Sequence, residues 1–155
     1  MKIEETALTE EVLAELVRLS EAWEAESSCW GYRANGKEDI EGNRIFLARE
    51  DGAVLGYLFG HCFESENMKS IMPEHSRCFE AEEIYVVPAR RSEGIGKALF
   101  EYAAETMKSE ADYITLSTAT KNWKAVFHFY LDELDMTFWS ARLFKTVPRQ
   151  ETPGR

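Results

Sequence analysis

Apolar and polar positions along the chain predict alternating strands and helices. Apolar residues at helical spacing follow Thr9, a suitable N-cap, and predict a first helix (Val12, Leu16, Leu19 and Trp23). One-sided apolar patterns predict two further helices, over residues 94–110 and 122–134. Runs typical of strands complete the set, at 2–6, 44–49, 53–62, 79–87, 113–118 and 137–144.

The order of these elements predicts a mixed α/β sheet with helices on its faces. Residues 50–52 (Glu-Asp-Gly) form a hairpin signal, whereas 79–118 read as a strand, a helix and a strand joined by a right-handed parallel crossover. Residues 24–42 read as a loop with one short helix at most, and residues 64–77 as a long polar loop. We expect one domain over residues 1–146 and a flexible tail over 147–155.

The acidic balance of the chain changes which partners are expected. The 155 residues carry a net charge of −10, which disfavours general binding to nucleic acids or anionic membranes and favours a cationic partner. No apolar run reaches the length of a membrane span, and no secretory signal is visible. Three widely spaced cysteines indicate free thiols in the cytoplasm and no zinc site, so we expect no metal.

The sharpest local signal lies in residues 86–97, between a predicted strand and a predicted helix. Two glycines, Gly94 and Gly96, allow close approach of the backbone to a ligand. Residues 90–97 carry a net charge of +2, from Arg90, Arg91 and Lys97 against Glu93. The spacing matches neither a P-loop nor a dinucleotide fingerprint. The segment therefore suits a pyrophosphate, or else is a glycine-rich turn with solvated arginines.

These residues resemble a known family. The stretch Arg91–Gly96 is similar to the Arg/Gln-x-x-Gly-x-Gly/Ala motif of the GCN5-related N-acetyltransferases (GNAT), and Ile84–Pro88 resembles the strand before that motif. Downstream, Asn122-x-x-Ala125 followed by Tyr130 resembles the segment that opens the family's fourth helix. The order of elements agrees with the family from residue 1 to about 144.

The resemblance implies a twisted mixed sheet of six to seven strands with about four helices, whose fourth and fifth strands splay apart around acetyl-CoA, the cosubstrate. By analogy, the backbone at the end of the fourth strand binds pantetheine, the following turn binds pyrophosphate, and an asparagine lies near the cofactor arm. The cofactor-binding residues implied are Ile84, Tyr85, Val86, Arg91, Ser92, Glu93, Gly94, Ile95, Gly96, Lys97 and Asn122.

The chain departs from the family pattern at the tyrosine that donates a proton to the leaving thiolate. The family places this tyrosine seven residues after the asparagine, where this chain has Phe129, and Tyr130 follows one position later. We interpret this offset as one extra residue that forms a local bulge in the helix. Tyr130 is the candidate acid, and a tyrosine of the hydrophobic core is the alternative.

The candidate base is Glu82, because polyamine acetyltransferases of the family have a glutamate at the matching place. Glu83 faces the other side of the pleat, so only one of the two carboxylates reaches the cleft unless a bulge intervenes. A base is required because an amine with a pKa near 10 is mostly protonated at neutral pH. Glu83, a water chain and a merely solvated acidic strand end remain alternatives.

Residues 1–42 hold eleven acidic and four basic side chains, with aromatic residues among them. In the family this region lines the acceptor cleft, so the implied substrate-binding residues are Trp23, Trp30, Tyr32 and Glu83. Acidic and aromatic groups together suit a small cationic amine, such as a polyamine or an aminoglycoside. A solubilising acidic surface, a protein or peptide acceptor, and a non-catalytic acyl-CoA-binding module are the alternatives. The last strand either belongs to the core or pairs across a homodimer.

Overall fold

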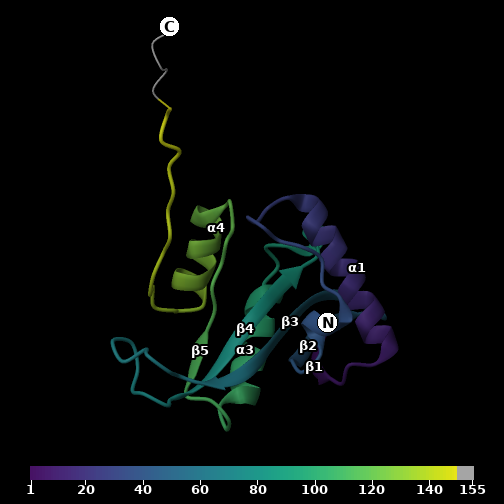
Figure 1. Ribbon diagram of the computed structural model, residues 1–155. Helices are drawn as coiled ribbons and strands as arrows, with labels where there is room; N and C mark the ends of the chain where they lie inside the picture. The colour runs from purple at the N-terminus through teal and green to yellow at the C-terminus, as the bar shows by residue number, and fades with distance from the viewer. Residues whose placement is uncertain (150–155) are drawn as a thin grey trace, which may run out of the picture.

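The computed structural model describes residues 1–149, and in them five strands form one sheet in the order β1-β2-β3-β4-β5 (Figure 1). Antiparallel pairing joins β1 to β2, β2 to β3 and β3 to β4, and β5 runs parallel to β4. The predicted mixed α/β class and the parallel crossover through the helix predicted at residues 94–110 are confirmed. The strands are β1 (Lys2–Thr6), β2 (Arg44–Glu50), β3 (Ala53–Glu64), β4 (Arg77–Val86) and β5 (Tyr113–Thr115).

Helices cover both faces of this sheet (Figure 1). One hydrophobic core lies between the sheet and α3, and a second lies between the sheet and the pair α1 and α2. Burying apolar side chains on both faces is the main stabilisation available to such a layered fold. The helical segments are α1 (Glu10–Glu26), α2 (Lys37–Ile40), the 3-10 turn η1 (Pro88–Arg90), α3 (Ile95–Met107), α4 (Trp123–Phe127) and the π-helical turn η2 (His128–Glu133).

The first helix begins where the sequence predicts it. The Val12 amide donates a hydrogen bond of 3.1 Å to Thr9 Oγ1, and Glu10 and Glu11 occupy the first turn, where negative charge is favourable. The helix ends at Ser27, which adopts a left-handed conformation.

The pairing between β3 and β4 contains a β-bulge. Phe59 pairs with Glu83 and Gly60 pairs with Ala81, so Glu82 has no partner residue on β3. A bulge reverses the alternation of side chains along the strand. Ala81 accordingly belongs to the core beneath α3, whereas Tyr85, an even number of residues later, belongs to the core beneath α1.

The contact between β4 and β5 is short. Only three positions pair, Cys78 to Glu80 with Tyr113 to Thr115, although β4 continues to Val86. Along the described chain, β4 therefore has no strand partner on its β5 side beyond Glu80. The strands separate there, as the resemblance implies for the cofactor-binding end of the sheet.

The expected extra residue in the last helix is confirmed. After the five residues of α4, the chain widens into the π-helical turn η2, and the Leu134 amide donates to the Phe129 carbonyl five residues earlier, at 3.0 Å. A π-helical turn accommodates one additional residue without ending the helix. Tyr130 lies within this turn.

The predicted final strand is wrong. Residues 137–144 are not paired with any described strand, and every residue from 137 to 149 is exposed. A strand requires a neighbour for its backbone hydrogen bonds, and the described chain supplies none there. The sheet therefore has five strands rather than six or seven. The predicted tail at 147–155 lies partly outside the described residues.

The bulge generates a prediction about Gly60. A Cβ atom at this position would lie 2.0 Å from the Glu80 carbonyl oxygen and 2.8 Å from Phe79 Cζ. We expect Gly60→Ala to lower the free energy of unfolding by about 1–3 kcal/mol, because backbone and ring must move apart. Gly36→Ala is the control, since its Cβ meets only the mobile Glu38 carboxylate. Equal unfolding midpoints in denaturant for both variants would contradict the prediction.

Candidate active site

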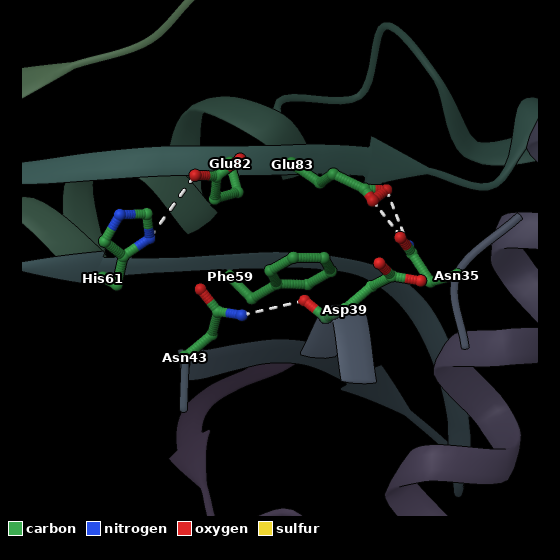
Figure 2. A pocket seen from close by; sticks show the side chains of 7 residues that line it. All are labelled: Asn35, Asp39, Asn43, Phe59, His61, Glu82 and Glu83. Carbon is green, nitrogen blue, oxygen red and sulfur yellow. Dashed lines mark hydrogen bonds and ion pairs between the residues drawn. The ribbon is translucent and has the colours of Figure 1, made fainter. Parts of the chain in front are cut away.

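A pocket of about 340 Å³ opens on the face of the sheet that carries α1 and α2 (Figure 2). Its walls come from β3, from β4 and from the segment around α2, and its polar groups are two asparagines, a histidine and three carboxylates. The bulge allows both glutamates of β4 to line this one pocket, which ordinary alternation would prevent. The lining residues are Asn35, Asp39, Asn43, Phe59, His61, Glu82 and Glu83.

Glu83 is the most constrained carboxylate of the pocket. Asn35 Nδ2 donates to both of its oxygens, at 2.6 and 2.9 Å, and the hydroxyl groups of Tyr32 and Tyr57 donate to Oε1 at 2.7 and 3.3 Å. Burial raises the pKa of Glu83, and these hydrogen bonds offset only part of that rise. The three donors therefore fix a carboxylate whose proton affinity is above normal.

The two tyrosines keep their protons beside this carboxylate. Burial raises the pKa of Tyr32, and the hydrogen bond to Glu83 raises it further. Burial also raises the pKa of Tyr57, with the negative charge of Glu83 acting in the same direction. Both hydroxyl groups thus remain donors at neutral pH.

Glu82 has a more open environment than Glu83. Its side chain is 46% exposed, and its Oε1 lies 3.4 Å from Nδ1 of His61 on β3 (Figure 2). Within the described residues this histidine is its ion-pair partner, so the carboxylate has room for a further contact. A carboxylate with free acceptor positions is able to take a proton from a group bound in the pocket.

Aromatic rings extend from the pocket toward the end of β4. Trp23 of α1 packs on Tyr32 with 4.4 Å between ring centroids and stacks on Tyr85 at 5.1 Å. The Tyr85 hydroxyl donates to Glu26 at 2.8 Å, and burial raises its pKa to about 12. Tyr32 therefore contacts Glu83 directly, and Trp23 packs on the far side of Tyr32.

The predicted phosphate-binding turn leads into α3. Gly94 caps this helix with φ of +85° and without a side-chain hydrogen bond, so the first amides of α3 have no acceptor within the helix. Gly96 lies against the Phe129 ring, and an added Cβ would be 3.2 Å from Phe129 Cζ. The helix has thirteen residues, and its N-terminus has a glycine as the N-cap and no side-chain cap. Such an N-terminus suits an anion.

The cations near this turn are paired within the chain, so the local positive charge is smaller than the residue count implies. Arg90 contacts Glu50 at 2.6 Å and Glu93 at 3.0 Å, and Lys97 lies 3.8 Å from Glu101. The backbone amides, rather than free basic side chains, are the main attraction for an anion here.

Arg91 joins the end of α1 to the end of β4. Its two terminal nitrogens donate to Glu26 at 2.6 and 3.0 Å, and its Nε donates to the Val86 carbonyl at 2.9 Å. Its guanidinium also lies 5.3 Å from the centre of the Tyr85 ring. The motif arginine thus contacts the protein itself at the strand end that the resemblance assigns to pantetheine.

Other predicted residues lie away from the pocket. Trp30 is 58% exposed, beside Lys121 and Phe144, and does not line the pocket. Asn122 caps α4, and Tyr130 lies half-buried in η2, where burial raises its pKa to about 12. The structure therefore brings Trp23, Tyr32 and the two glutamates together and leaves Trp30 apart.

Sequence reasoning missed five of the seven residues that line the pocket. Nothing in the sequence marks residues from the 31–43 loop and from β3 as neighbours of the glutamates, because their contacts span about fifty positions in the chain or depend on strand register. The pocket residues missed are Asn35, Asp39, Asn43, Phe59 and His61, and Tyr57, which donates to Glu83, was missed as well.

Among residues 1–149, no group of three or more histidine, cysteine, aspartate or glutamate side chains is arranged to hold a metal ion. Within the same range, no helix has both the length and the apolar character needed to cross a membrane.

The sequence model of the Acetyltransferase (GNAT) family matches residues 6–134, and the chain belongs to this family of N-acetyltransferases. The family uses acetyl-CoA as its cosubstrate. No curated protein matches the chain.

Solved structures share the fold at low sequence identity. A ribosomal-protein-alanine N-acetyltransferase from Brucella melitensis biovar Abortus 2308 has a TM-score of 0.65 and 20% identity, over 94% of this chain and 100% of its own. An aminoglycoside acetyltransferase from an uncultured soil metagenomic sample has a TM-score of 0.65 and 16% identity, over 95% of this chain and 96% of its own. A transcriptional regulator from Bacillus halodurans C-125 has a TM-score of 0.69 and 18% identity, over 94% of this chain and 100% of its own.

Burial of Glu83 generates a prediction about pH. Because the folded state raises the pKa of this acid above 4.5, it binds the proton more tightly than the unfolded state, and stability falls as pH rises through the folded pKa. Glu83→Gln lacks this dependence. We therefore expect the unfolding free energy of the variant, relative to the parent protein, to increase as pH is raised from 4.5 toward neutrality in denaturant titrations.

Glu26→Gln is the matched control of opposite sign. Burial raises the pKa of Glu26, but hydrogen bonds from Arg91 and Tyr85 lower it further, so the net shift is downward. The contribution of Glu26 to stability is therefore lost as pH falls. The relative unfolding free energy of this variant should decrease as pH is raised through the folded pKa of Glu26 to 4.5, and should change little above 4.5. The same trend in both variants would refute the assignment for Glu83.

Proposed function

We propose that the protein transfers the acetyl group of acetyl-CoA to a primary amine of a small cationic acceptor, polyamine-like or aminoglycoside-like. One observation carries the proposal. The pocket on β4 has three carboxylates and no lysine or arginine among its lining residues, and the same strand leads through η1 and the turn at 91–94 into the uncapped N-terminus of α3. A cation site and an anion site thus adjoin one strand.

The anion site suits the cosubstrate. The amides at the start of α3 and the turn before them, where Ser92 and Gly94 have positive φ, are the groups we assign to pyrophosphate. The free edge of β4 beyond Glu80 offers backbone groups for the pantetheine amides. Acetyl-CoA, when bound, supplies the thioester carbonyl that the amine attacks.

The cation site suits the acceptor. An ammonium group entering the pocket meets the fixed carboxylate of Glu83 and the more accessible one of Glu82. We assign Glu83 and Asp39 to attracting and orienting the acceptor. A cavity of about 340 Å³ is large enough for a small molecule, which favours a small acceptor over an alternative protein or peptide acceptor.

Glu82 is the proposed base. It takes one proton from the acceptor ammonium, either directly or through water, and leaves a neutral amine whose lone pair forms the new bond to the carbonyl carbon. Glu83 is less suitable because its oxygens are occupied by the donors Asn35, Tyr32 and Tyr57. His61 lies beside Glu82, with its Nδ1 3.4 Å from Glu82 Oε1.

Tyr130 is the proposed acid. With a pKa raised to about 12, its hydroxyl is protonated at neutral pH and has a proton to give to the thiolate when the carbon–sulfur bond breaks. The π-helical turn compensates for the one-residue offset from the family spacing, which supports this assignment over Phe129. Phe129 instead packs against Gly96 at the phosphate-binding turn.

The function is tested by thiol release from acetyl-CoA in the presence of diamines, polyamines, aminoglycosides and peptides. We expect turnover with small polycationic amines, and a fall in kcat of roughly 10²-fold in Glu82→Gln and in Tyr130→Phe, with KM for acetyl-CoA little changed. Tyr102→Phe, on the exposed face of α3, is the control. Turnover on peptides alone would show that the acceptor is a protein or peptide. Binding of coenzyme A without turnover on any amine would indicate a non-catalytic module.

The phosphate-binding turn is tested by Gly94→Asp. The added carboxylate faces the site proposed for the pyrophosphate, so we expect coenzyme A affinity in calorimetry to fall about tenfold or more, equal to about 1.4 kcal/mol. Gly52→Asp is the matched control, because both glycines have positive φ, +85° and +80°, and open space at Cβ. Equal coenzyme A affinities for the two variants would refute the assignment of the turn.

A further inference from the structure

Trp30 lies outside the acceptor pocket, and its contacts indicate a different role. Its side chain is 58% exposed, and the Lys121 ammonium lies over the indole ring, 4.8 Å from the ring centroid. The Phe144 ring packs edge-on against the same indole, at 5.6 Å. A cation over an aromatic face is attracted by the charge distribution of the ring, so the indole holds the Lys121 side chain in place.

The backbone around Trp30 pairs with the chain that leads into α4. Cys29 and Thr120 form an antiparallel bridge, and a backbone hydrogen bond of 2.8 Å lies on either side of it. We call this contact the α1–α4 bridge, and Figure 1 shows the loop after α1 meeting the chain just before α4. The two bonds run from the Trp30 amide to the Ala119 carbonyl and from the Lys121 amide to the Ser28 carbonyl.

Tyr130 lies between two attachments of the last helical region. On one side, Leu134 and Met136 pack against the core between the sheet and α3, and Phe129 contacts Gly96. On the other side, the α1–α4 bridge holds the chain that enters α4. Because no residue of α4 or η2 is fully buried, these attachments decide where the helical region lies.

The α1–α4 bridge is also close to Tyr130 itself. Burial raises the pKa of Tyr130 to about 12, and negative charge on Cys29 acts in the same direction. A charge has such an effect only on a group that lies near it. A displacement of the bridge therefore changes the immediate surroundings of Tyr130 as well as the start of its helix.

We infer that Trp30 is a positioning residue for acetyl transfer, because its indole stabilises the α1–α4 bridge that aligns Tyr130 with the leaving thiolate. The inference rests on the proposed function, in which the Tyr130 hydroxyl gives its proton to the sulfur as the carbon–sulfur bond breaks. Proton transfer depends steeply on the placement of the donor, so a loosened bridge lowers kcat. A tryptophan that bound the acceptor directly would act on the KM for the amine instead.

Steady-state thiol release by the full chain tests the inference, with acetyl-CoA and a polyamine or aminoglycoside that the parent protein acetylates. We expect Trp30→Ala to lower kcat about tenfold and to change either KM less than about twofold. Trp30→Phe should keep most of the parent kcat, because the phenyl ring still presents an aromatic face to Lys121.

Trp123→Ala is the matched control. Trp123 is 55% exposed and has Lys124 at 5.5 Å from its ring, but it packs on Phe127 of its own helix and takes no part in the α1–α4 bridge. Its kcat should equal that of the parent protein. Equal kcat values for Trp30→Ala and Trp123→Ala would overturn the inference, and so would a loss confined to the KM for the amine.

A double variant distinguishes positioning of Tyr130 from a general loss of structure. In the Tyr130→Phe background, Trp30→Ala should lower kcat by less than about twofold further, because the hydroxyl that Trp30 aligns is already absent. A further tenfold fall in this background would overturn the inference.

Amide hydrogen exchange tests the α1–α4 bridge without turnover. The Leu134 and Met136 amides donate to the carbonyls of Phe129 and Tyr130, and they should exchange several-fold faster in Trp30→Ala than in Trp123→Ala. Equal exchange rates would overturn the inference, whatever the activity. Faster exchange in Trp30→Ala together with no turnover by the parent protein on any amine would support the bridge and contradict the proposed function.

Discussion

The pairing of β3 with β4 slips by one residue between Gly60 and Ala81, and the pocket depends on that slip. Without it, Glu83 would point with Ala81 into the apolar core beneath α3, where an unpaired carboxylate is costly. The slip turns Glu83 to the side of α1 and leaves Glu82 unpaired on the same side. Gly60 permits it, since only a residue without Cβ fits so close to the Glu80 carbonyl.

Around this bulge the protein joins two half-sites through one helix. The backbone amide of Asn35 donates a hydrogen bond to Ser20 Oγ of α1, and its side-chain Nδ2 donates to Glu83. The carboxylate pocket is therefore connected to the middle of α1. The end of α1 is tied to the phosphate-binding turn, because Glu26 accepts from both Arg91 and Tyr85. A shift of α1 would therefore act on the acceptor side and on the cofactor side together.

The C-terminal part of the molecule is held differently. None of the residues of α4 or η2 is fully buried, and Leu134 and Met136 pack this region against the core between the sheet and α3. Elements with few buried apolar contacts are the ones that open most easily. The position of Tyr130 thus depends on the π-helical turn and on the Phe129 contact with Gly96.

The sequence by itself determined the mixed sheet, the helix starts at Thr9 and Gly94, and the extra residue before Tyr130, because caps, glycines and apolar periodicity act over a few neighbouring residues. It also singled out both glutamates of β4 as candidate site residues. Only the tertiary structure decided that they share one pocket, since a strand's register depends on its partner. For the same reason residues 137–144, which have a strand pattern, form no strand where the described chain offers them no edge.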